Sequence, residues 1–211
     1  MSTDPGSYSK EAFRLPDTAS FDEADWIRGC QNGDFSGFDR LVLRYQTAVY
    51  AVCLRMLRDP HEAEDVAQEA FVRAYRAIGS FKGGSKFSTW MIAIAINLCR
   101  NRRRWWARRR RRIAGSLEDT LQTEEGSVGY EPQDTAPTPS QAAVSYETQA
   151  HILGMLQRLN ESDRSIIVLR DLQGCSYDEI AQVLRVRIGT VKSRLNRARL
   201  QLRALLNGWL S

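Results

Sequence analysis

The sequence has no long apolar segment. No run of about eighteen apolar residues occurs among its 211 residues, so no transmembrane helix is predicted. The first residues, MSTDPGSYSKEAF, contain neither the basic stretch nor the apolar stretch of a secretory signal peptide. These absences predict a cytoplasmic protein that does not insert into a membrane.

Metal-ligating and disulfide-forming patterns are also missing. The chain has two histidines, and neither stands at metal-ligand spacing from a cysteine. No C-x-x-C motif occurs among the four cysteines, which are Cys30, Cys53, Cys99 and Cys175. Isolated cysteines of this kind are typically buried reduced thiols. The sequence therefore predicts no metal, no disulfide and no cofactor.

Positive charge is abundant but confined to one segment. The net charge is +5, yet the segment from Arg100 to Arg112 alone holds nine arginines and no acidic residue. Outside it, acidic residues outnumber basic ones. A focused basic segment is typical of proteins that bind a polyanion such as nucleic acid, although a solvated basic face gives the same pattern.

The N-terminal half has the periodicity of helices. Ser20 and Glu23 stand at capping-box spacing and predict a helix start there. The pair Asp59 and Pro60 predicts the start of a later helix, with an N-cap acid followed by proline at the first helical position. Between them, one long amphipathic helix is predicted from apolar residues at steps of three or four: Phe38, Leu41, Val42, Tyr45, Val49, Val52 and Met56.

A glycine-rich loop separates these helices from the arginine segment. The residues 79–86, GSFKGGSK, form the predicted loop, and Ser88 is expected to cap the helix that leads into the arginines. Farther along, residues 113–144 are rich in Gly, Ser, Thr, Pro and acids, which predicts an extended acidic linker. Two apolar stripes follow before Gly174 and predict two more helices: Ile152, Met155, Leu156 and Leu159, then Ile166, Ile167 and Leu169.

No strand pattern occurs, so the predicted fold is all-α. We expect a disordered tail over residues 1–20, a helical domain over 21–112, the linker over 113–144 and a second small helical domain over 145–211.

The C-terminal domain has the pattern of a helix-turn-helix. Ser176 and Glu179 form a capping box before a short helix, and a tight turn is expected at residues 185–187. The next helix places its apolar residues on one face: Ile188, Val191, Leu195, Ala198, Leu202 and Leu205. Polar residues on the other faces could contact base edges in the major groove, although a solvated basic helix would look the same.

The helix after Pro60 carries an acidic strip. Its residues fall at helical spacing and comprise Glu62, Asp65, Gln68 and Glu69. A solvated face and a docking site for an arginine-rich partner explain this strip equally well. A metal site is disfavoured because no other element offers further ligands.

Three segments resemble one family, the extracytoplasmic-function sigma factors of bacterial RNA polymerase. They read AEDVAQEAFVRAY, SFKGGSKFSTWMIAIAINLCRNRRR and YDEIAQVLRVRIGTVKSRLNRARLQLR, in the order and spacing of that family. The resemblance covers residues 35–104 and 144–206. It implies a sigma factor with regions 2 and 4, which directs core polymerase to promoters and is not itself an enzyme.

The family's contacts map onto named positions. The resemblance implies that the acidic strip docks on the beta-prime coiled coil, that region 4 meets the beta flap, and that an anti-sigma protein controls the factor. Contacts to the minus-ten element are implied for Phe81, Lys82, Ser85, Lys86, Trp90, Asn97, Arg100, Arg103 and Arg104. Aromatic surface there would replace stacking lost by a flipped base. For Trp90, core packing is an equally good explanation.

Minus-thirty-five contacts are implied for Arg187, Thr190, Lys192, Ser193, Asn196 and Arg197. Lys192 stands where arginine is frequent in the family, and Asn196 often corresponds to a bulkier apolar residue, so no promoter sequence is predicted. The turn at Arg185 lacks the usual glycine.

Two other functions compete. A stand-alone helix-turn-helix regulator would bind operator DNA without polymerase, and a recombinase-like enzyme would need a nucleophile or carboxylate cluster that the sequence does not display. The block Arg108–Arg112 exceeds what phosphate contact to one duplex needs, and one hypothesis is a disordered basic arm that strengthens nonspecific binding.

Overall fold

The computed structural model describes residues 21–116 and 151–210. The predicted tail and nearly all of the predicted linker lie outside these residues. All regular secondary structure in the described part of the chain is helical, which confirms the all-α class.

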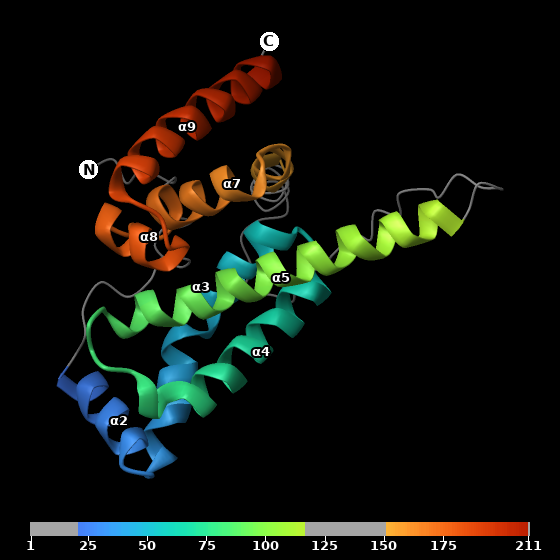
Figure 1. The fold of residues 1–211 in the computed structure, drawn as a ribbon. Coiled ribbons are helices and arrows are strands. Elements are labelled where there is room, and N and C mark those ends of the chain that lie inside the picture. Colours follow the sequence, from blue (N-terminus) through green and yellow to red (C-terminus); the bar gives the residue numbers. More distant parts are fainter. Residues whose placement is uncertain (1–20, 117–150, 211) are drawn as a thin grey trace, which may run out of the picture.

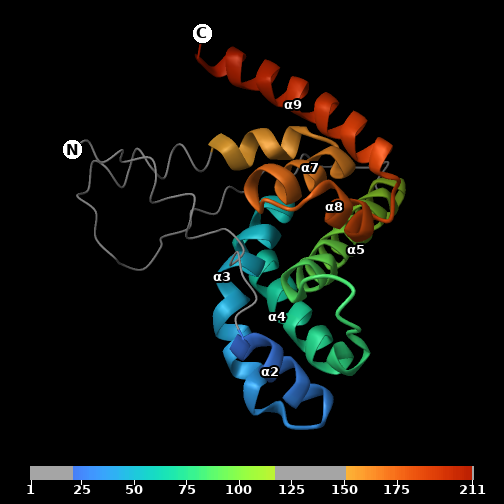
Figure 2. The ribbon, with the colours of Figure 1, turned by 90° about the vertical axis from the view of Figure 1, so that its left-hand side faces the viewer.

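The helices before and after the gap form two groups that contact each other (Figures 1 and 2). The N-terminal helices are α2 (Phe21–Gln31), η1 (Phe35–Gly37), α3 (Phe38–Leu57), α4 (Pro60–Ala77), η2 (Ile78–Ser80) and α5 (Phe87–Ser116). The C-terminal helices are the helical residues 151–158, α7 (Glu161–Ile167), the π-helix η3 (Val168–Leu172), α8 (Tyr177–Leu184) and α9 (Ile188–Leu210). Helices α3, α4 and α5 pack on one another, while α7 and α8 pack on α9.

Local sequence signals set the helix ends. The Asp59 side chain accepts a hydrogen bond of 2.9 Å from the Glu62 amide, and Pro60 is the first residue of α4, as predicted. The capping box of Ser176 and Glu179 begins α8, also as predicted. The expectation for Ser88 was wrong, because α5 begins one residue earlier, at Phe87, and Ser88 is buried. The predicted cap Ser20 lies outside the described residues.

Where the family usually has glycine, Arg185 adopts the left-handed conformation, with φ 54°, and ends α8. This conformation costs a non-glycine residue about 1 kcal/mol. Helix α9 then begins at Ile188, and the helix-turn-helix forms despite the missing glycine.

One hydrophobic core runs through both groups of helices. It includes Met56 near the end of α3 and Leu156 and Ile166 of the C-terminal helices, and all four cysteines are free and buried within it. The prediction that Ile188 faces the core was wrong. Ile188 remains 40% exposed, because it is the first residue of α9, where periodicity cannot show whether a neighbour covers it. Ile152, in the apolar stripe that precedes α7, is also 43% exposed.

A buried arginine joins the two groups of helices. Arg164 of α7 is fully buried and donates to the carbonyls of Leu156, Gln157 and Leu159, at 2.7 to 2.9 Å. It also donates to the Met56 carbonyl at 2.9 Å. These carbonyls lie at the C-terminal ends of two helices, where backbone acceptors have no intrahelical partner and the helix dipole favours a cation. Arg164 therefore caps one helix from each group.

Further polar contacts cross the same interface. The Thr89 hydroxyl donates to Glu179 Oε1 at 2.8 Å, which connects α5 to the capping box of α8. The Gln157 amide donates to the Arg55 carbonyl at 3.1 Å. The interface thus combines a shared apolar core with directional hydrogen bonds.

Candidate polymerase and nucleic-acid interfaces

The acidic strip lies on the surface of α4. Asp65 and Gln68 are exposed, whereas Glu62 and Glu69 are half-buried. Arg102 of α5 forms an ion pair of 2.7 Å with Glu62, and Arg73 forms one of 2.7 Å with Glu69. The two outer carboxylates of the strip are therefore neutralised within the protein, and Asp65 and Gln68 between them face solvent.

Three aromatic rings cluster where the loop meets α5. The centroid of Phe81 lies 5.2 Å from that of Trp90 and 5.7 Å from that of Phe87. Phe87 is buried, while Phe81 and Trp90 are half-buried. Trp90 is thus both a packing residue and part of an accessible aromatic surface.

The loop beside this cluster presents polar groups. Lys82 and Lys86 are exposed and Ser85 is half-buried, and Gly83 has a positive φ of 70°. The Gln31 amide donates to the Phe81 carbonyl at 2.7 Å, which attaches the loop to α2. The pKa of Glu179 is lowered overall. Burial alone would raise it, but the hydrogen bonds from Ser176 and Thr89 and the charge of Lys86 outweigh burial. This carboxylate therefore stays ionised beside the loop.

The predicted DNA-binding residues of α5 fall into two environments. Asn97 and Arg104 are exposed. Arg100 instead forms an ion pair of 2.8 Å with Glu161 of α7. Arg103 donates to the Met56 carbonyl at 3.1 Å and to Gln157 Oε1 at 2.9 Å, and burial lowers its pKa. The side chains of Arg100 and Arg103 therefore take part in the contact between the two groups of helices.

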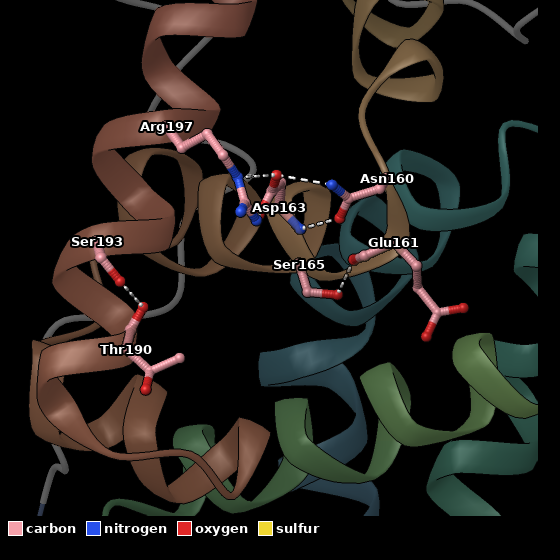
Figure 3. A network of polar contacts seen from close by, with 7 residues as sticks. All are labelled: Asn160, Glu161, Asp163, Ser165, Thr190, Ser193 and Arg197. Atoms are coloured by element: carbon pink, nitrogen blue, oxygen red, sulfur yellow. Dashed lines mark hydrogen bonds and ion pairs between the residues drawn. The ribbon is translucent and has the colours of Figure 1, made fainter.

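The predicted recognition helix α9 presents polar residues beyond its packed face. Lys192, Ser193 and Asn196 are exposed, and Thr190 is half-buried. The Ser193 hydroxyl donates to the Thr190 carbonyl at 3.1 Å (Figure 3). The carbonyl of the exposed residue Arg187 accepts the amide of Val191, so Arg187 lies at the start of the helix.

A bidentate ion pair orients Arg197 (Figure 3). Its guanidinium donates to both carboxylate oxygens of the fully buried Asp163, at 2.8 and 3.0 Å, and this raises the pKa of Arg197. The Asn160 side chain holds the same carboxylate through a hydrogen bond of 2.7 Å. Because the Arg197 side chain is still 57% exposed, its remaining N–H groups face solvent.

Sequence reasoning missed Arg164. Burial lowers its pKa to about 10, yet the residue stays charged at neutral pH. Its sequence neighbourhood, ESDRSII, looks like an ordinary first turn of a helix, so no local signal indicates a partner more than one hundred residues away.

Two negative findings apply to the described residues alone. Over 21–116 and 151–210, no helix is long and apolar enough to cross a membrane. In the same residues, no cluster of three or more histidine, cysteine or carboxylate side chains is arranged to hold a metal ion.

Comparisons with known proteins match both groups of helices. The family model for sigma-70 region 2 matches residues 41–113, and that for sigma-70 region 4 matches residues 150–202. The chain is 40% identical over 173 residues to the RNA polymerase sigma-H factor of Pseudomonas aeruginosa, covering 82% of this chain and 88% of that protein. It is 37% identical over 183 residues to the ECF RNA polymerase sigma factor SigW of Bacillus subtilis, covering 85% and 94%.

One solved sigma-factor structure has a similar fold. The sigma factor RpoE of Bartonella quintana, in complex with the anti-sigma factor NepR, superposes with a TM-score of 0.59 at 26% identity, covering 81% of this chain and 96% of that chain. These matches span the helices that carry the acidic strip, the aromatic cluster and the helix-turn-helix. This chain belongs to the extracytoplasmic-function sigma factors of the sigma-70 family.

Proposed function

We propose that this protein binds core RNA polymerase in the cytoplasm, recognises the minus-thirty-five and minus-ten promoter elements, and opens the DNA for initiation without an active site of its own. The observation that carries the proposal is the presence of both sigma-70 regions in one chain, each with exposed polar residues on the faces predicted to bind.

Polymerase docking is assigned to α4. Arg102 and Arg73 hold the flanking carboxylates Glu62 and Glu69, so a basic partner surface meets the strip at Asp65 and Gln68. A carboxylate and an amide at the centre of such a surface offer charge-assisted and neutral hydrogen bonds to a helical coiled coil.

Minus-ten opening is assigned to the loop and the aromatic cluster. Phe81 and Trp90 offer ring surface on which an extruded base can stack. Lys82 and Lys86 offer positive charge to the phosphates of that nucleotide, and Ser85 offers a hydroxyl group for a hydrogen bond. Asn97, exposed farther along α5, offers an amide to a base edge.

Minus-thirty-five binding is assigned to the start of α9. Lys192 and Asn196 are exposed and suited to base edges, while Arg187, Thr190 and Ser193 lie near the helix N-terminus, which favours phosphate. Arg197 contributes through the N–H groups that Asp163 leaves free.

Promoter binding requires the two groups of helices to separate. In the structure, Glu161 and Gln157 of the C-terminal helices occupy Arg100 and Arg103, which we assign to promoter DNA. Core polymerase would hold the two regions apart and convert several weak contacts into one strong complex. An anti-sigma protein, of the kind that RpoE of Bartonella quintana binds, would cover these surfaces.

The test is in vitro transcription with purified core polymerase and genomic promoter fragments. We expect specific transcripts with the intact protein and at least a tenfold loss with the double variant Asp65→Ala and Gln68→Ala. The matched control removes an exposed aspartate and glutamine elsewhere, Asp22→Ala and Gln201→Ala, and should transcribe normally.

Absence of any promoter-specific transcript with the intact protein would overturn the proposal. If the protein alone then shifted specific DNA without polymerase, a stand-alone regulator would take its place.

A further inference from the structure

The last helical turns of the arginine segment project beyond the helical bundle. Figure 1 shows α5 extending past α3 and α4 at its C-terminal end. We call residues Trp105–Arg112 of this projection the arginine arm. Every side chain of the arm except Ala107 is exposed, and Trp105 and Trp106 are 44% and 39% exposed. Two neighbouring indoles in solvent at the end of a helix are not explained by packing of the bundle.

One face of the arm combines an indole with guanidinium groups. Trp105, Arg108, Arg109 and Arg112 line a shallow recess, at the helical spacing i, i+3, i+4 and i+7. The guanidinium carbon of Arg109 lies 5.3 Å from the centre of the Trp105 ring, within the range of a cation–π interaction. The face is therefore both strongly cationic and partly apolar.

The arm differs from the preceding part of α5 in its ion pairs, although Glu69 lies in the same recess as Trp105 and Arg108. Within the part of the chain that the structure describes, none of Arg108–Arg112 forms an ion pair, whereas Arg100 and Arg102 each pair with a glutamate. Five adjacent guanidinium groups repel one another and gather counterions. A partner that displaces many counterions at once, a polyanion, gains the most from binding here.

We propose that the arginine arm binds the sugar-phosphate backbone of the duplex DNA immediately upstream of the minus-ten element. This rests on the proposed function, which assigns the loop 81–86 to opened DNA. That loop precedes the N-terminal end of α5, and the arm forms the opposite end. DNA that runs along α5 is therefore opened at the loop end and still paired at the arm.

The length of the helix sets the position of the contact. Fifteen residues separate Asn97 from Arg112, which corresponds to about 22 Å along an α-helix. The same distance spans roughly six base pairs. Arginines of the recessed face meet phosphates there, and the Trp105 indole packs on the edge of the deoxyribose. The contact positions the factor and carries no sequence information.

The test measures binding of the reconstituted holoenzyme to a promoter fragment as a function of KCl concentration. The triple variant Arg108→Gln, Arg109→Gln and Arg112→Gln removes three charges from one face. If each arginine neutralises one phosphate, the plot of log affinity against log KCl concentration becomes shallower by about 2.7. The factor by which affinity falls between 50 and 200 mM KCl is then roughly 40 times smaller than for the unchanged protein.

The matched control removes three exposed arginines elsewhere, Arg28→Gln, Arg40→Gln and Arg158→Gln, and should keep the wild-type slope. A photocrosslinking residue in place of Trp106, nine residues beyond Asn97, should react with DNA about four base pairs upstream of the opened element. An unchanged slope in the arm variant, or crosslinking to a polymerase subunit, an acidic protein or this chain itself, would overturn the arm's role.

The two proposals fail separately. Absence of promoter-specific transcription with the intact protein rejects the sigma function. Normal transcription with a wild-type slope in the arm variant rejects the arm alone.

Discussion

The two ends of the arginine segment have opposite environments on the same helix. At its start, Arg100, Arg102 and Arg103 donate to Glu161, Glu62, Gln157 and the Met56 carbonyl. At its end, Arg108–Arg112 have no ion-pair partner in the described residues and face solvent. The first set contributes to the folded structure, and the second remains available for a ligand.

This difference shows that charge alone does not indicate what an arginine binds. In the sequence the nine residues form one basic segment. Their environments diverge because α4 and α7 cover the start of the segment and leave the end uncovered. A guanidinium that loses contact with water requires an acceptor, whereas an exposed one does not.

The largest effect is expected for the most deeply paired arginine of this interface. Arg164→Met keeps the volume but removes four hydrogen bonds and leaves the carbonyls of Gln157 and Leu159 without a donor. Arg103 still donates to the Met56 carbonyl, and the Leu159 amide to the Leu156 carbonyl. Because each unsatisfied buried acceptor costs roughly 1 to 3 kcal/mol, the free energy of unfolding should fall by about 3 kcal/mol. Urea denaturation measures this. The exposed control Arg158→Met should change it by less than about 0.5 kcal/mol, and an equal loss in both variants would contradict the capping role.

A matched pair on α5 compares the two sets directly. Arg103→Gln should lose about 1 to 2 kcal/mol of stability, because glutamine cannot reach both Met56 and Gln157. Arg110→Gln should change the free energy of unfolding by less than about 0.5 kcal/mol. The change should be stabilising, because the charge of Arg110 disfavours the charged form of Arg103. Thermal and urea unfolding of both variants would measure the contrast. Equal losses would show that the two ends of the segment do not differ.

Weakening the interface should strengthen polymerase binding. Glu161→Gln removes the ion pair with Arg100, in which each side chain is about a quarter exposed. A pair of this kind contributes up to about 1 kcal/mol, so the separated form should become up to roughly fivefold more populated and core affinity should rise by the same factor. Fluorescence anisotropy with labelled protein would measure it. Asp39→Asn, an exposed change on α3, is the control and should not alter affinity.

The smallest effect is expected for an arginine that is paired but exposed. Arg199 of α9 pairs with Asp171 of η3, and its side chain is 51% exposed. A double-mutant cycle with Arg199→Gln and Asp171→Asn should give a coupling energy of about 0.5 kcal/mol. A coupling as large as the loss from Arg103→Gln would show that exposure does not separate the two kinds of arginine.

Most of the fold could be predicted because its signals are local. Asp59 and Ser176 are the N-caps of the helices that follow them, as predicted. The apolar residues of α3 are buried as far as Met56, at the predicted spacing. The error at Ile188 arises at the first residue of α9, where a few residues decide whether a neighbour covers the face. The turn at Arg185 also formed without glycine, because the rest of the helix-turn-helix offsets its local cost.

The contact between the two groups of helices could not be predicted. It depends on pairs such as Arg164 with Met56 and Thr89 with Glu179, which are 108 and 90 residues apart. No periodicity or spacing rule connects such positions. For that reason the family resemblance implied DNA contacts for Arg100 and Arg103, and nothing in the sequence indicated that both residues bind other parts of the folded chain.

The way Arg164 is bound has a kinetic consequence. Three of its four carbonyl partners belong to the C-terminal helices, and only the Met56 carbonyl belongs to the other group. When the groups separate, Arg164 keeps those three bonds, and water replaces the fourth at little enthalpic cost. Breaking this contact therefore does not require either group to unfold. We expect the interface to open by a hinge-like motion, which in proteins occurs on the microsecond-to-millisecond scale.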